Sequence, residues 1–94
     1  MISKHVNEIL EIFRENYRTI KCVESRHESY KKFEVESSNL YPELECKDVF
    51  ILNNNKVFTI DDLEFADIKT INGNQVVFLG NYRFYFNDDT FKFN

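Results

Sequence analysis

The chain has 94 residues, of which 43% are hydrophobic, 30% charged and 16% aromatic. This composition is typical of a folded globular protein, and the length predicts a single domain over residues 1–94. The net charge of −4 disfavours a general binder of phosphate backbones. The longest apolar runs are too short to predict a membrane span.

The acidic excess is concentrated in the second half of the chain. Residues 1–47 carry 8 basic and 9 acidic side chains, whereas residues 48–94 carry 4 and 7. Such a charge distribution suits a protein partner with a basic surface, including a surface that otherwise holds nucleic acid. Two cysteines, Cys22 and Cys46, are too few for a disulfide framework. Together with a charged N-terminus, they predict a cytoplasmic protein with free thiols.

The first predicted element is an amphipathic helix over about residues 3–17. Ser3 is a suitable N-cap. Apolar residues then recur at helical spacing on one stripe: Ile2, Val6, Ile9, Leu10, Phe13 and Tyr17. Ile12 lies off this stripe and is expected to be a single exposed apolar residue. The stripe predicts that the helix covers the apolar face of a sheet.

The remainder, residues 18–94, is predicted to be rich in β-structure. Alternation of apolar and polar residues over 18–24 and 30–36 predicts a hairpin whose turn lies within residues 25–29. A competing interpretation extends the first helix to about His27, because the residues in between are tolerated in helices.

The middle of the chain predicts a second hairpin. A loop is expected from Ser37, because serines and an asparagine are followed by a proline. Residues 43–52 then form a strand, residues 53–55 a turn and residues 56–60 the returning strand. The two aspartates at 61 and 62 are expected to end that strand.

Residues 68–93 predict an antiparallel meander with three tight turns. Asn72-Gly73 favours a type I′ turn and Gly80-Asn81 a type II′ turn, because these types need positive φ at the positions that the residues occupy. Residues 87–89 supply the third turn. With two-residue loops, the cross-strand pairs are Ile68–Val77, Val77–Phe84 and Phe84–Phe93.

This register places large apolar side chains on one face of the meander. The face also carries Ala66, Leu79, Tyr82, Phe86 and Phe91. The opposite face has two mixed rows: Asp67, Phe78 and Arg83, then Lys69, Val76, Tyr85 and Lys92. An ordinary solvated face is the first interpretation of these rows, and a binding surface is the second. The predicted fold class is α+β, with one N-terminal amphipathic helix packed on an antiparallel meander sheet of about six or seven strands.

Three arrangements resemble catalytic or metal sites without meeting the requirements of one. His5, Cys22, His27 and Cys46 lack the closely paired spacing of zinc ligands. The tripeptide at 45–47 (Glu-Cys-Lys) occurs in metal-dependent nucleases, but it needs a second acid such as Asp61, Asp62 or Asp67 and arises easily by chance.

The paired aspartates at 61–62 and 88–89 occupy turns and point to opposite sides, so neither pair converges on one substrate. The chain has two glycines and no glycine-rich phosphate loop. No enzymatic activity, cofactor or metal is therefore expected.

The preferred function is non-enzymatic protein binding. A small acidic inhibitor, or an immunity or anti-defence protein of a phage or mobile element, would block a basic surface of its partner. The predicted partner-binding residues are Asp61, Asp62, Glu64, Asp67, Phe78, Arg83, Tyr85, Asp88 and Asp89. The alternative is a binder of single-stranded nucleic acid, in which Phe78 and Tyr85 stack on bases beside Lys69, Arg83 and Lys92. Homodimerisation through a sheet edge or the outer face is compatible with either function.

Overall fold

The structure is a computed structural model that describes residues 2–17, 19–26, 29–42 and 47–86. Within these residues the chain forms two helices and eight strands, so the predicted α+β class is confirmed. The helices are α1 (Lys4–Glu15) and α2 (Ile60–Leu63). The strands are β1 (Lys21–Arg26), β2 (Ser29–Phe33), β3 (Val35–Ser38), β4 (Asp48–Leu52), β5 (Val57–Thr59), β6 (Asp67–Ile71), β7 (Asn74–Leu79) and β8 (Tyr82–Tyr85).

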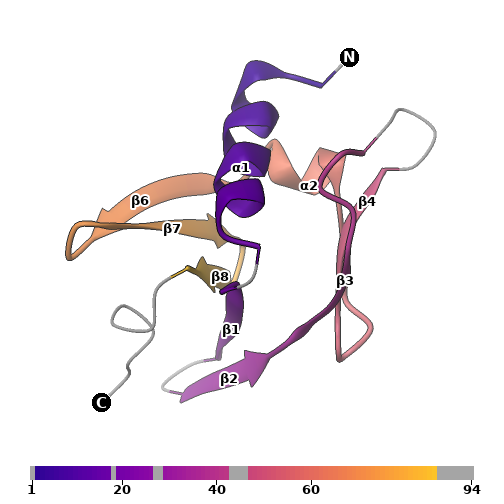
Figure 1. The fold of residues 1–94 in the computed structure, drawn as a ribbon. Helices are drawn as coiled ribbons and strands as arrows, with labels where there is room; N and C mark the ends of the chain where they lie inside the picture. Colours follow the sequence, from indigo (N-terminus) through magenta and orange to yellow (C-terminus); the bar gives the residue numbers. More distant parts are fainter. Residues whose placement is uncertain (1, 18, 27–28, 43–46, 87–94) are drawn as a thin grey trace.

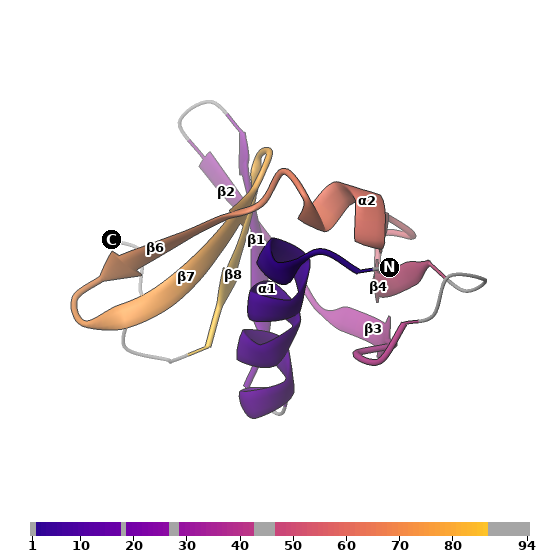
Figure 2. The same ribbon diagram turned by 90° about the horizontal axis from the view of Figure 1, so that it is seen from above.

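The strands form two antiparallel sheets rather than the one meander sheet that the sequence predicted. The larger sheet has the order β2-β1-β8-β7-β6, and the smaller has the order β3-β4-β5. The chain passes from one sheet to the other at Glu34, between β2 and β3. Figure 2 shows α1 and the smaller sheet on the same side of the larger sheet. The two sheets and α1 therefore share one core.

Helix α1 begins where the sequence predicted. The Ser3 hydroxyl accepts a hydrogen bond from the Val6 backbone N–H at 3.1 Å, which satisfies a donor that the first turn leaves open. The helix ends at Glu15 rather than at Tyr17, and the Asn16 N–H donates to the Phe13 carbonyl at 3.2 Å.

The burial of two apolar side chains in this region differs from the prediction. Ile12 is 7% exposed and belongs to the core, whereas Tyr17 is 57% exposed. Figures 1 and 2 show α1 in the angle between the two sheets, where a helix is covered over a wider arc than on one flat sheet. Tyr17 lies two residues beyond the last helical residue, so the helical stripe no longer determines its direction.

Strands β1 and β2 form the predicted first hairpin. Cys22 pairs with Phe33 and Ser25 with Tyr30 in an antiparallel register. Because α1 has already ended at Glu15, the alternative of a helix extending to about His27 is wrong. The chain then continues as a strand to Ser38, so the loop expected from Ser37 starts later.

The middle hairpin is confirmed in its described part. Strand β4 pairs with β5, and the turn between them places Asn55 at a φ of 68°. Residues 43–46 of the predicted strand lie outside the described residues. The aspartates that were expected to end β5 instead belong to α2, a single helical turn.

Strands β6, β7 and β8 form the predicted meander in the predicted register. Ile68 pairs with Val77, and Val77 with Phe84. Positive φ angles occur at Asn72 (51°), Gly73 (80°) and Gly80 (60°), as the type I′ and type II′ turns require.

The predicted pairing of β8 with a fourth strand of the meander is wrong, because the second edge of β8 pairs with β1. Phe84 faces Cys22 on that side, which leaves no room for the predicted pair with Phe93. The third turn at 87–89, with Phe91 and Lys92, lies outside the described residues.

Aromatic rings connect the three layers of the core. Phe13 of α1 lies 4.4 Å from Phe50 of β4 and 5.2 Å from Phe84 of β8, measured between ring centroids. Phe58 of β5 lies 5.5 Å from Phe84, so the two sheets also touch directly. Tilted and edge-to-face pairs of this kind contribute about 0.5–1.5 kcal/mol each beyond the burial of their area.

Candidate functional site

The segment from α2 into β6 carries four of the predicted partner-binding residues. Asp62 accepts a hydrogen bond from the Thr59 N–H at 2.8 Å, and its own N–H donates to the Thr59 hydroxyl at 3.3 Å. This reciprocal capping box satisfies open donors at the start of α2, where the helix dipole also favours negative charge. Asp62 therefore has a structural role in this turn.

The other three acids of this segment point to solvent. The side chain of Asp61 is 75% exposed, and its carboxylate lies 3.8 Å from Lys47 Nζ. A pair between two such exposed groups contributes little to stability. Glu64 and Asp67 are also exposed. These three carboxylates are available to a basic partner.

An exposed phenylalanine, which the sequence analysis missed, lies among these acids. Phe65 is 83% exposed, the highest value among the large hydrophobic residues that the structure describes. Its neighbour Ala66 is 1% exposed, and the Ala66 carbonyl accepts a hydrogen bond from His5 Nε2–H at 2.7 Å. Because the Ala66 side chain is buried and its carbonyl is bonded to His5, the neighbouring side chain of Phe65 points into solvent. Because Ala66 was already assigned to the core face, side-chain alternation could have revealed Phe65.

We call Asp61, Glu64, Phe65 and Asp67 the α2–β6 surface. The backbone beneath it is tied down by short-range hydrogen bonds. The Phe65 N–H donates to the Asp62 carbonyl at 3.1 Å, and the Ala66 N–H donates to the Leu63 carbonyl at 3.2 Å. The ring of Phe65 and the carboxylates around α2 therefore project from a turn whose backbone is fixed by hydrogen bonds.

Of the remaining predicted residues, Phe78, Arg83 and Tyr85 lie on the outer face of the larger sheet, which is the face opposite α1. The predicted row of Asp67, Phe78 and Arg83 is confirmed by the strand register. Tyr85 is 2% exposed and packs with Val23 and Val76 in a second apolar cluster. The Tyr85 ring therefore serves packing in this structure. Asp88 and Asp89 lie outside the described residues.

Cations and rings alternate across this outer face. The Arg83 guanidinium carbon lies 5.1 Å from the Phe78 ring centroid and 5.7 Å from that of Tyr30. Lys69 Nζ lies 4.6 Å from the same Phe78 centroid. Tyr30 joins the face because β1 and β2 extend the sheet beyond β8, an arrangement that the sequence analysis did not predict.

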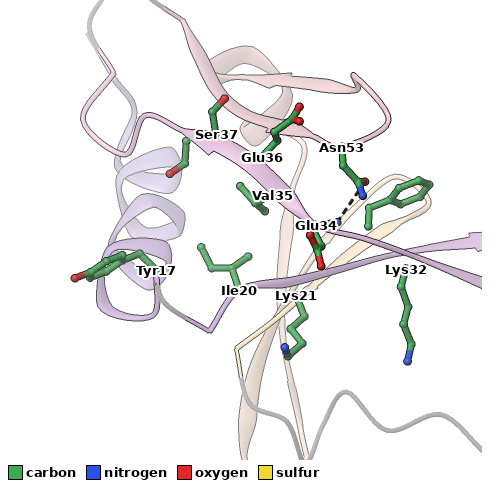
Figure 3. Close-up of a pocket in the computed structure, with 11 residues that line it drawn as sticks. Tyr17, Ile20, Lys21, Lys32, Glu34, Val35, Glu36, Ser37 and Asn53 are labelled. Atoms are coloured by element: carbon green, nitrogen blue, oxygen red, sulfur yellow. Dashed lines mark hydrogen bonds between the residues drawn. The ribbon is translucent and has the colours of Figure 1, made fainter.

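An open cleft of about 840 Å³ lies where the two sheets diverge. Its lining comes from the end of α1, the start of β1, the segment 32–38 and Asn53. Figure 3 shows Ile20 and Val35 facing one another across it, with Tyr17 at one end. Ile20 and Val35 also pack against the core, so they close the core on this side. The lining mixes lysines, glutamates and serines and favours no single ligand chemistry.

The buried thiol of Cys22 and the partly buried phenol of Tyr82 both have raised pKa values. Burial, with a smaller contribution from Glu24, raises the pKa of the Cys22 thiol to about 12. This thiol is protonated at neutral pH and acts as a packing group rather than a nucleophile. Partial burial likewise raises the pKa of Tyr82.

No cluster that could hold a metal ion occurs among the described residues. His5 donates to a backbone carbonyl, and Cys22 is buried. The other members of the zinc set considered above, His27 and Cys46, lie outside the described residues, as does the glutamate of the Glu-Cys-Lys tripeptide.

Comparison with protein-family models, curated proteins and solved structures found no match to this chain. None of the helices in the described part of the chain is long and apolar enough to cross a membrane.

Proposed function

We propose that this chain is a non-enzymatic protein-binding module that covers a basic surface of a partner protein. The observation that carries the proposal is Phe65, a large apolar side chain that is 83% exposed and has the exposed acids Asp61, Glu64 and Asp67 close to it in the sequence. Leaving such a ring in water is unfavourable, and single aromatic anchors often dominate the binding energy of an interface.

The chemistry of the α2–β6 surface defines the partner. Phe65 would enter an apolar pocket, and Asp61, Glu64 and Asp67 would face lysines or arginines at the rim of that pocket. Opposite charges around an apolar anchor accelerate association and select the correct partner. A partner of this kind resembles a surface that normally binds nucleic acid, which supports an inhibitor that acts by steric and electrostatic blocking. An immunity or anti-defence protein of a phage or mobile element would act in this way.

The decisive experiment is an affinity pull-down from host lysate after nuclease treatment, comparing the wild type with Phe65→Ala. We expect the wild type to retain a stoichiometric protein and Phe65→Ala to lose at least about 2 kcal/mol of binding, which is roughly 30-fold in affinity. Tyr41→Ala is the matched control, because Tyr41 is 73% exposed but lies elsewhere, where it stacks on Arg14 at 4.3 Å.

A charge-reversed variant tests the rim. The double variant Asp61→Lys and Glu64→Lys should weaken binding without unfolding, and Glu8→Lys on the exposed side of α1 serves as its control. Asp62 is left unchanged, because it caps α2. Equal retention of the partner by wild type and Phe65→Ala, or loss of the partner on nuclease treatment, would contradict the proposal.

A further inference from the structure

The outer face of the larger sheet has the opposite charge to the chain as a whole. In the described strands, its outward positions carry four cations and one acid, which are Lys21, Lys32, Lys69 and Arg83 against Asp67. The chain has a net charge of −4, so this local excess of positive charge runs against its composition. A face of this kind is complementary to a polyanion.

Two rings on this face are accessible. Tyr30 on β2 is 46% exposed, and Phe78 on β7 is half-buried. Arg83 on β8 lies between them, at 5.7 Å from one centroid and 5.1 Å from the other. Lys69 on β6 continues the line beyond Phe78. The result is a series in which rings alternate with cations, with members from four of the five strands of the larger sheet.

This alternation matches the chemistry of a single nucleic-acid strand. Bases stack on aromatic rings and on guanidinium planes, while phosphates between them contact lysine and arginine. A duplex hides its base faces, so a flat aromatic sheet face favours unpaired strands. An acidic peptide would use the cations, but only a nucleic-acid strand carries a planar ring with every charge along its length.

We infer that the outer face of the larger sheet is a second binding site, which takes single-stranded nucleic acid through Tyr30, Arg83, Phe78 and Lys69, with Lys32 at its edge. This site adjoins the α2–β6 surface, because Asp67 of that surface pairs with Phe78, but it uses different side chains and does not depend on the proposed function. Contacts between the local cations and phosphates release counterions, so the interaction is expected to be strongest at low salt although the chain has a net charge of −4.

The test is fluorescence anisotropy with labelled dT12 and rU12 over a range of salt concentrations. Contacts from Lys32, Lys69 and Arg83 predict a slope of log K against log salt of about −2, and Lys69→Gln should reduce that slope by about 0.7. Tyr30→Ala should weaken binding roughly 5- to 150-fold through lost stacking. Comparison of the two oligonucleotides shows whether the site prefers RNA or DNA.

Three controls separate this site from general attraction between charges. Lys4→Gln removes an exposed cation on α1 and should leave the affinity unchanged. Phe65→Ala should also leave it unchanged, which separates this site from the α2–β6 surface. Phe78→Ala removes part of an apolar cluster, so its melting temperature is measured first, and Tyr30→Ala carries the test if that variant unfolds.

Three results would overturn the inference. The first is no binding of either oligonucleotide at low salt. The second is an equal loss of affinity in Lys4→Gln and Lys69→Gln, which would show that no particular face is used. The third is displacement of the oligonucleotide by poly-glutamate as effectively as by unlabelled oligonucleotide, which would identify the face as a site for acidic protein segments.

Discussion

Replacing Ile12 with alanine distinguishes the packing of α1 in this structure from the simpler arrangement that its apolar stripe predicts. Ile12 is 7% exposed and lies in the main core. The substitution removes three carbon atoms, and at about 0.8 kcal/mol for each buried carbon the transfer cost is about 2.4 kcal/mol. The unfilled cavity adds to this cost, and the total falls within the range of about 2–5 kcal/mol that is usual for such substitutions.

Urea denaturation followed by circular dichroism measures this cost. A chain of 94 residues is expected to have a free energy of unfolding of about 5–14 kcal/mol, so the variant should still fold. Its Tm should fall by at least 8 °C, because each kcal/mol lowers the Tm of a domain of this size by about 4–8 °C. Glu11→Ala, at the neighbouring exposed position, should change stability by less than about 0.5 kcal/mol. If Ile12→Ala were as stable as Glu11→Ala, α1 would not lie between the two sheets.

Four further predictions concern the turns and the buried thiol. Thr59→Ala should cost about 1 kcal/mol of stability in urea denaturation, because it removes the hydroxyl that caps α2. Thr59→Ser keeps a hydroxyl and should retain most of this stability. An equal loss of stability in both variants would contradict a capping role. Gly73→Ala should cost at least about 1 kcal/mol of stability in the same assay, because φ is +80° at this residue. Steric overlap is not the cause, since a Cβ would meet no atom within 4 Å. Gly73→Asn should cost less, because asparagine tolerates positive φ better than alanine does. If the two variants were equally stable, the backbone angle would not be the cause. In a Cys46→Ser background, Ellman's reagent at pH 8 should leave Cys22 unmodified until urea is added, because this thiol is buried. Rapid reaction of the reagent with the native protein would refute the burial of Cys22. The raised pKa of Cys22 also predicts that stability falls as the pH rises from about 9 toward 12. The reason is that the unfolded thiol ionises near 9.0 while the folded thiol keeps its proton. Cys22→Ala should lack this part of the pH dependence.

The features that the sequence determined by itself are those that neighbouring residues control. Ser3 caps α1 because its hydroxyl reaches a donor three residues away. Asn72-Gly73 and Gly80-Asn81 set tight turns because their backbones accept positive φ, and each turn then determines the register of the strands on either side. The hairpin of β1 and β2 was predictable from the alternation of apolar and polar residues in its two strands.

The functional candidates were only partly predictable. Asp61, Glu64 and Asp67 could be selected from composition and charge, and the structure shows them exposed. Tyr85 looked equally suitable, but it is buried in the second apolar cluster, which no local pattern reveals. Phe65 was missed, although its alternation with Ala66 could have revealed it, whereas Tyr30 depended on which strand lies beside β8.

Only the tertiary structure decided how these local units assemble. Period-two alternation shows which side chains share a face, but it does not state which strand occupies a free edge. The edge of β8 pairs with β1, a strand more than 50 residues earlier in the chain, rather than with the residues that follow. That pairing extends the larger sheet, sends β3 into a second sheet and places α1 between them, which buries Ile12. Pairing between distant strands depends on the packing of the whole core, and that information is distributed over the chain rather than contained in any one segment.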